Sequence, residues 1–408
     1  MLKFIKKFKD LSKPSKSMVY LMWIYRIGSI VSSVFINIYV FKFQKNLLDV
    51  VFYNGFFLTF CLLGFSGLGL FMAALKRDIR FMYYIAYFLF ILAFVIIFLI
   101  GGYLGIFLFA ILYGLGNGIF RCAVHTQELS NIKDKSRDLY SSIVVSGDNI
   151  FKIIVPFFIS ILFYFIGKFF DFSPYIVLFL LLPFVYVFSF LFIKNLSLYI
   201  PREVNYKDFK NFFSFKKNRF GFLYFLFGGL YYSPFNILFP IVSIILLKTE
   251  VNVGIYEGAF YILSTIIIIL FSSIRKKDNR LSIMFYTSIL IFINLIIFIF
   301  NFNFIGYIIY SMISLVLNPM FRVSEQVFDM KLMDTIRASG SDFYPAMIFR
   351  ELCLWIGRMI SIIILIIFIT LGYDVDVIIR IGLFFTGLFI FMTSISVFLH
   401  FKFDDKNN

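Results

Sequence analysis

Asp148 and Lys152 are charged residues within a long apolar run, and their types and spacing could couple two binding events. They are four residues apart, in the acid-first order that favours an ion pair between neighbouring turns of a helix. One interpretation is a structural pair that neutralises itself. The other is a switch, in which an anionic ligand engages Lys152 and releases Asp148 to take up a proton.

Three more charges, Arg350, Glu351 and Arg358, lie in another apolar run. Glu351 and Arg358 are two helical turns apart on one face, so about 10 Å separates their backbones. Either a bound ligand or a salt bridge between helices could join these two side chains. Charges inside a membrane span are rare and costly, so they indicate a ligand pathway or an ion pair.

Arg26 begins a polar stripe in a third run, where Ser29, Ser33 and Asn37 follow at the i+3, i+7 and i+11 positions. These positions share one face of an α-helix, and we expect that face to lie in the protein interior. Small polar residues of this kind form hydrogen bonds between helices. We interpret Arg26 instead as a contact to a ligand or to a gate.

Positive charges outnumber negative charges within the apolar runs. The four basic residues named above outnumber the two acidic ones, so we expect an anionic or zwitterionic ligand rather than a cation. Glu257, near one end of another run, offsets part of that excess. A further polar face, related to the Arg26 stripe, carries Tyr232, Ser233 and Asn236 after a pair of glycines.

Composition indicates that helices in a membrane must position these residues. Of 408 residues, 61% are hydrophobic and 15% are charged, against about 25% charged in an ordinary soluble domain. Apolar runs of roughly 18 to 28 residues match the length of a transmembrane helix. We therefore predict an all-α membrane protein with twelve transmembrane helices, at about 17–41, 50–75, 81–100, 102–123, 139–167, 173–195, 220–247, 252–274, 281–300, 302–324, 343–371 and 377–401.

Basic residues indicate the orientation. With both termini inside, 29 of the 38 Lys and Arg residues fall in cytoplasmic segments, which agrees with the positive-inside rule. We therefore expect a multi-pass protein of the cell membrane, and we assign the net charge of +16 to the membrane surface rather than to nucleic acid. The predicted parts are a basic amphipathic N-terminal tail (1–16), a six-helix bundle (17–195), a cytoplasmic central loop (196–219), a second six-helix bundle (220–401) and a C-terminal tail (402–408).

The two halves of the chain resemble each other. Three short matches recur in the same order at offsets of 201, 200 and 204: Asn117–Arg121 with Asn318–Arg322, Lys76–Arg80 with Lys276–Arg280, and Asp138–Tyr140 with Asp342–Tyr344. Matches at nearly one offset predict a duplicated six-helix unit. Parallel repeats of this kind build many transporters.

With these features the sequence resembles the major facilitator superfamily. That family repeats a loop signature of the form Gly-x-Leu-Ala-Asp-Arg-x-Gly-Arg-Arg. Here Asp78 with Arg80, and Asp278 with Arg280, keep the acid and a base, but both glycines are missing and the acid is shifted. The run Phe349–Arg358 is also similar to a pattern in a poorly characterised bacterial branch.

The resemblance implies two bundles that rock around a central site, with spans 1, 4, 7 and 10 lining the path. Arg121 and Arg322 end equivalent spans, and we expect them to form gate salt bridges with Glu128, Glu325 or loop acids rather than to contact substrate.

The sequence is compatible with three functions. The first is a secondary active transporter that moves a small solute by alternating access, with proton coupling as an option. The second is a drug or lipid exporter of the same fold. The third is a lipid-linked transferase, which would need clustered catalytic Asp, His or Glu residues. The sequence has no such cluster, so we expect no enzyme. The sequence has no P-loop motif, so we do not expect ATP hydrolysis to drive transport.

No cofactor or metal site is expected. Cys61, Cys122 and Cys353 have no CxxC spacing, and the two histidines, His125 and His400, are far apart. The expected partners are a small-molecule solute, membrane lipids and, in the coupled version, protons. We expect a monomer.

Overall fold

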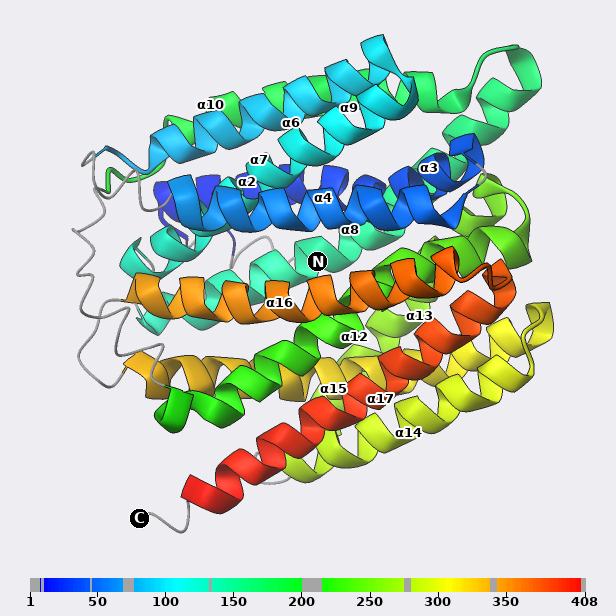
Figure 1. The fold of residues 1–408 in the computed structure, drawn as a ribbon. Coiled ribbons are helices and arrows are strands. Elements are labelled where there is room, and N and C mark those ends of the chain that lie inside the picture. The colour runs from blue at the N-terminus through cyan, green and yellow to red at the C-terminus, as the bar shows by residue number, and fades with distance from the viewer. Residues whose placement is uncertain are drawn as a thin grey trace. The chain divides into compact units, whose positions relative to one another are not determined.

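All described secondary structure is helical in the computed structural model (Figure 1). The structure describes residues 8, 11–44, 46–68, 77–131, 134–199, 215–274, 280–337 and 343–404. Its elements are α2 (Lys13–Val31), η1 (Ser32–Ile36), α3 (Asn37–Gln44), α4 (Leu47–Leu63), η2 (Gly64–Leu68), α6 (Arg80–Ile100), α7 (Gly102–Asn131), α8 (Asp134–Phe169), α9 (Pro174–Val187), α10 (Ser189–Ile193), α12 (Phe215–Leu247), α13 (Glu250–Ile274), α14 (Arg280–Phe300), α15 (Phe304–Arg337), α16 (Phe343–Thr370) and α17 (Val375–Asp404).

The helices follow the apolar runs of the sequence. Among the described residues, eleven helical segments are long and apolar enough to cross a membrane. Three of them join consecutive elements: α2 with η1 and α3, α4 with η2, and α9 with α10. Together with α13, 25 residues long, they account for the twelve predicted runs, and the predicted all-α fold class is confirmed. The chain is a multi-pass membrane protein.

The chain divides into two compact units. Unit 1 comprises Met1–Gln44, Phe52–Val204 and Glu250–Gly258. Unit 2 comprises Lys45–Val51, Asn205–Thr249 and Ala259–Asn408. Most of the first six spans thus lie in unit 1, and α12 and α14–α17 lie in unit 2.

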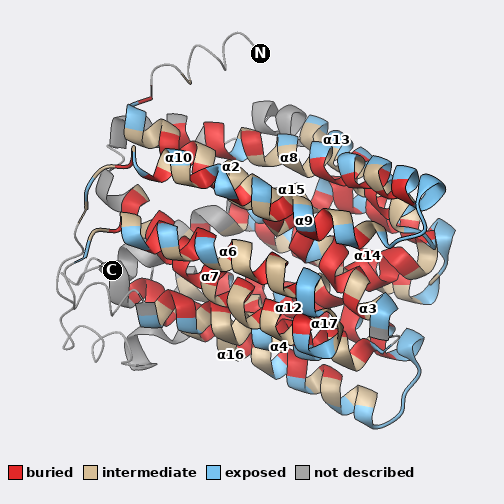
Figure 2. Cartoon of the chain, turned by 90° about the horizontal axis from the view of Figure 1, so that it is seen from above, coloured by how far each residue is buried: buried red, intermediate tan, exposed pale blue. Residues whose placement is uncertain are grey.

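In unit 1, α6 packs along α7 and α9, and α2 packs along α8. The turn between α6 and α7 uses Gly101 and Gly102, whose φ angles of 59° and 56° suit glycine. Figure 2 shows buried and exposed residues alternating along the helices. Exposed residues of these apolar helices include many Phe, Ile and Leu side chains, as expected of surfaces that face lipid.

In unit 2, α12 packs against both α16 and α17, and α14 packs against α15 and α17. The crossing of α12 and α16 is tight because glycines lie on both sides of it. A Cβ atom at Gly229 would come within 2.2 Å of the Leu354 carbonyl oxygen, and one at Gly357 within 2.2 Å of the Leu226 carbonyl oxygen. The two backbones are therefore in direct contact.

Several helices extend beyond their apolar runs. The run predicted at 302–324 belongs to α15, which continues to Arg337, and α8 begins at Asp134 rather than 139. The central loop predicted at 196–219 is shorter on its C-terminal side, because α12 begins at Phe215. Hydropathy marks only the part of a helix within lipid, so it misses polar helical extensions.

The N-terminal tail predicted at 1–16 overlaps the first span, because α2 begins at Lys13. Pro14 lies in the first turn of α2, where its missing N–H is not needed, and the Ser12 hydroxyl accepts a hydrogen bond from the Ser15 N–H at 3.3 Å. Phe8 contacts Tyr20 and Trp23 of α2. Residues 1–7, 9 and 10 lie outside the described part of the chain.

Candidate functional sites in the two units

The Arg26 guanidinium of α2 forms an ion pair with the Asp148 carboxylate of α8 in unit 1. The Trp23 indole of α2 packs against α8 at Gly147, where a Cβ atom would lie 1.9 Å from the indole nitrogen. Asp148 is thus paired across helices with a residue 122 positions away. Lys152 lies one turn further along α8, and its predicted role in a switch stays a prediction.

The polar stripe of the first span is not one regular face. Ser32–Ile36 form a π-helical segment, which changes the register of the residues after it. Ser33 is exposed, whereas Asn37 is buried. The Asn37 side chain accepts a hydrogen bond from Asn54 of α4 at 2.8 Å and donates to the Ser33 carbonyl at 2.9 Å. The expectation of a single α-helical stripe is therefore wrong, and Asn37 links two helices.

Asn117 extends the polar region next to Arg26. Its amide donates to the Tyr25 hydroxyl at 3.0 Å, and its side-chain oxygen accepts from the Cys61 thiol at 3.7 Å. Arg121, one turn later on α7, is half-buried. The predicted gate role of Arg121 stays a prediction.

Asp78 organises the loop before α6. Its carboxylate accepts hydrogen bonds from the Arg80 side chain and from the backbone N–H groups of Arg80 and Tyr199, the latter two at 3.3 Å. The N–H of Ile79 also donates to the Tyr199 carbonyl at 2.9 Å. This loop is thereby held to the segment that follows α10. In the second half of the chain, Asp278 lies outside the described residues, and Arg280 begins α14.

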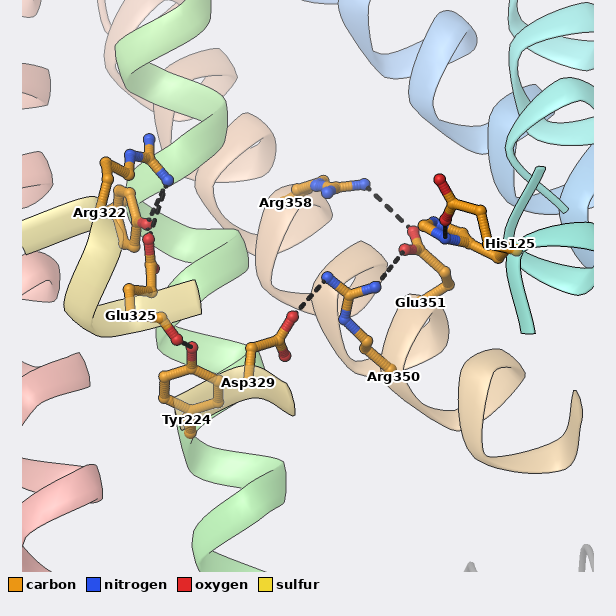
Figure 3. A network of polar contacts seen from close by, with 10 residues as sticks. His125, Tyr224, Arg322, Glu325, Asp329, Arg350, Glu351 and Arg358 are labelled. Atoms are coloured by element: carbon orange, nitrogen blue, oxygen red, sulfur yellow. Dashed lines mark hydrogen bonds and ion pairs between the residues drawn. The ribbon is translucent and has the colours of Figure 1, made fainter. Parts of the chain in front are cut away.

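Unit 2 contains a chain of alternating charges (Figure 3). Arg350 lies between Asp329 and Glu351, with N–O distances of 2.8 and 3.7 Å. Arg358 approaches the other oxygen of Glu351 at 3.9 Å. Glu351 and Arg358, two turns apart on α16, therefore form a long ion pair through their side chains.

Asp329 was not among the predicted site residues. It lies on the polar extension of α15, four residues after Glu325 and seven after Arg322. This spacing places all three on one helical face, so the pattern could have been found in the sequence. It was missed because the predicted span ended at residue 324.

Arg322 pairs with Glu325 at 3.0 Å, one of the acids expected as its partner. The Tyr231 hydroxyl donates to Glu325 and accepts from Arg322 at 3.0 Å. The Tyr224 hydroxyl donates to the Glu325 carbonyl at 3.3 Å. The cluster ties α12 to α15, and its predicted role as a gate stays a prediction.

Tyr232 of α12 lies close to two guanidinium groups of unit 2. Its ring centroid is 5.7 Å from Cζ of Arg322 and 5.5 Å from Cζ of Arg358. Tyr232 is 40% exposed. The two arginines come from different helices, so this ring joins the α15 cluster to the α16 charges.

Within the described ranges, no group of three His, Cys, Asp or Glu residues is placed to hold a metal ion. The cysteines Cys61, Cys122 and Cys353 are free and buried.

The sequence matches no protein-family model and no curated protein. Two similar solved structures are the crystal structure of the nucleoside transporter NupG and that of a bacterial homologue of the iron transporter ferroportin in its inward-facing state. NupG is 12% identical to this chain, with a TM-score of 0.68, and the match covers 96% of this chain and 100% of NupG. The ferroportin homologue is also 12% identical, with a TM-score of 0.67, and the match covers 94% of this chain and 97% of the homologue. Both are transporters of the major facilitator fold, and this chain has that same fold.

Proposed function

We propose that this protein is a secondary active transporter that moves a small solute across the cell membrane by alternating access. Two lines of support come from the fold. The fold of the chain matches that of two transporters over nearly its full length, and its division into two compact units supports alternating access by two bundles.

The observation that carries the proposal is the placement of charges inside apolar helices of both units. Arg26 pairs with Asp148 in unit 1, and Arg358 meets Glu351 in unit 2. Ionisable residues within membrane spans are costly, and in membrane proteins they mark substrate paths, proton relays or paired sites.

Coupling to protons is part of the proposal. Asp148 is 14% exposed, and its Oδ1 atom has no hydrogen-bond partner among the described residues. A solute that competes for Arg26 or Lys152 would change the electrostatic environment of this carboxylate, and proton binding would respond. Solute binding and protonation would then be linked through one acid.

The proposed orientation has both termini in the cytoplasm. With this orientation, 29 of the 38 Lys and Arg residues fall in cytoplasmic segments, as the positive-inside rule expects. Membrane lipids are the surrounding partners of the exposed apolar side chains, and the working unit is proposed to be the monomer.

Transport by the purified protein in proteoliposomes tests the proposal. A metabolite panel is first screened for thermal stabilisation, because a ligand that binds only the folded state raises apparent stability. Stabilising compounds are then measured for uptake with and without an inward acid gradient. We expect at least one small solute to accumulate above its external concentration only with the gradient. Movement of apolar dyes or lipids alone would favour the exporter alternative.

A further inference from the structure

Arg358 has hydrogen-bond donors that the described protein does not use. Its side chain is 9% exposed and lies near the middle of the span Ala346–Thr370. Its Nε atom has no partner, and the nearest described acid, Glu351, is 3.9 Å away, beyond hydrogen-bond distance. A guanidinium has five N–H donors, and buried polar groups are almost always satisfied. The unpaired Nε and the long distance to Glu351 therefore favour a further acceptor that comes from outside the protein.

Tyr232 is the exposed neighbour of this guanidinium. The ring is 40% exposed, and Arg358 and Arg322 approach it from α16 and α15. A cation near the face of an aromatic ring is stabilised without occupying its N–H donors. Tyr232 therefore lies beside both guanidinium groups and is itself accessible.

The crossing of α12 and α16 fixes this geometry. Gly229 and Gly357 bring the two backbones into contact. Tyr232 follows Gly229 by three residues, and Arg358 follows Gly357 directly. Groups positioned by packed helices are held more precisely than groups on loops, so the pair is preorganised.

The arginines of unit 2 differ in how well they are neutralised. Arg322 has Glu325 at 3.0 Å, and Arg350 has Asp329 at 2.8 Å. Arg358 shares Glu351 with Arg350, at the longest distance of the set, 3.9 Å. An incoming anion could therefore bind Arg358 while Glu351 keeps its contact with Arg350.

We propose that Arg358, with Tyr232 and Arg322 beside it, binds an oxyanion of the solute, a carboxylate or a phosphate, in competition with Glu351. The inference rests on the proposed transport function for the identity of the ligand as a solute. Guanidinium groups bind both oxyanions through paired N–H···O bonds. The chemistry is the same for the two, so the probes must separate them.

Binding by the purified full-length protein in detergent provides the test. The probes are sodium benzoate and inorganic phosphate, with uncharged benzamide and sodium chloride of matched ionic strength as controls. We expect benzoate or phosphate to raise the melting temperature of the wild type, and benzamide and chloride to leave it unchanged. Stabilisation by benzoate alone assigns a carboxylate ligand, and by phosphate alone a phosphate ligand. No stabilisation by either oxyanion overturns the site.

Substitutions then locate the binding. Arg358→Gln should weaken binding of the oxyanion probe by about tenfold or more, because a charge-assisted contact is lost. The matched control is Arg380→Gln: Arg380 of α17 also lies over an aromatic ring, Phe302, at 5.3 Å, but is exposed. This variant should bind like the wild type. Equal binding by Arg358→Gln and the wild type overturns the proposal.

Glu351→Gln is the second variant and keeps the test decisive if Arg358→Gln fails to fold. Removing the competing carboxylate charge should tighten oxyanion binding by several-fold, since Arg358 is then left for the probe. Unchanged or weaker binding by this variant contradicts the proposed competition.

Transport measurements separate this inference from the proposed function. If Arg358-dependent oxyanion binding holds but the reconstituted protein moves no solute, the transport proposal fails and the site stands as a binding site. If the protein transports solutes that lack an acid group, with a KM that Arg358→Gln leaves unchanged, transport stands and the site is overturned.

Discussion

At the scale of single residues, Asp148 is the acid most closely tied to the proposed coupling. Asp148→Asn removes the charge that pairs with Arg26 but retains side-chain size and hydrogen bonding. We expect loss of pH-driven accumulation in proteoliposomes and retention of solute exchange, because exchange needs binding but no net proton movement. Uptake at several pH gradients, compared with counterflow of labelled solute, measures the two activities separately.

Glu257→Gln is the comparison variant for this prediction. Glu257 of α13 is a further acid within an apolar run, and no ion pair of it is found among the described residues. Full pH-driven uptake by Asp148→Asn, with loss of it in Glu257→Gln, would move the coupling role from Asp148 to Glu257. The Arg26–Asp148 pair would then be structural.

Asp78 gives a prediction about stability. Asp78→Ala leaves the Tyr199 and Arg80 N–H groups without their shared acceptor. We expect the free energy of unfolding to fall by about 1 kcal/mol. The fall is small because the ion pair between Asp78 and Arg80 is partly exposed. Asp78→Asn, which retains an acceptor, should lose less. Thermal unfolding in one detergent checks the order, and equal melting temperatures for Asp78→Ala and the wild type would contradict it.

Sequence spacing predicted the charged residues but not all of their partners. Lys152 was the expected partner of Asp148 because only neighbours within a helix can be paired from spacing. The Arg26–Asp148 contact joins residues 122 positions apart, and it depends on how α2 packs against α8. Arg322 with Glu325 could be predicted because both lie on one helix, three residues apart.

At the scale of elements, the α12–α16 crossing is the feature most sensitive to substitution. Gly357→Ala places a methyl group 2.2 Å from the Leu226 carbonyl oxygen. Overpacking of this kind costs about 1–3 kcal/mol, and a backbone atom cannot move aside cheaply. We expect a clear fall in melting temperature and weaker binding at Arg358, measured on the same purified protein.

Gly167→Ala is the matched control for the crossing. Gly167 lies in α8, and a Cβ atom there would have no neighbour within 4 Å. Alanine is the better helix former by about 1 kcal/mol, so this variant should be as stable as the wild type or more so. A fall in stability equal to that of Gly357→Ala would show that glycine is needed for a reason other than close packing.

Two elements show where the sequence pattern is insufficient. The π-helical segment Ser32–Ile36 depends on a change in backbone hydrogen bonding, which hydropathy and residue spacing do not encode. The extension of α15 to Arg337 is polar, so an apolar-run criterion ends too early. By contrast, α6 at Arg80–Ile100 begins and ends within one residue of its predicted run, because both of its ends are also the ends of the apolar sequence.

At the scale of the whole molecule, apolar runs and short repeated motifs were sufficient to predict the fold. The reason is physical: each span must satisfy its backbone hydrogen bonds internally in lipid, so a long apolar run leaves helix as the one available structure for a chain of this kind. The solute cannot be predicted in the same way. It depends on a few side chains such as Arg358 and Tyr232, whose proximity comes from helix packing.

The proposed topology places Asp78, Lys207 and Asp278 on the cytoplasmic side of the membrane, and cysteines introduced at these positions test it. The parallel repeat places positions 78 and 278 on one membrane face, and the basic-residue bias places that face, with position 207, in the cytoplasm. An impermeant thiol reagent should therefore label all three only after the cells are permeabilised. The native cysteines are buried, so the unmodified protein supplies the background. Labelling of position 207 in intact cells would reverse the orientation, and opposite results at positions 78 and 278 would show that the halves are not parallel repeats.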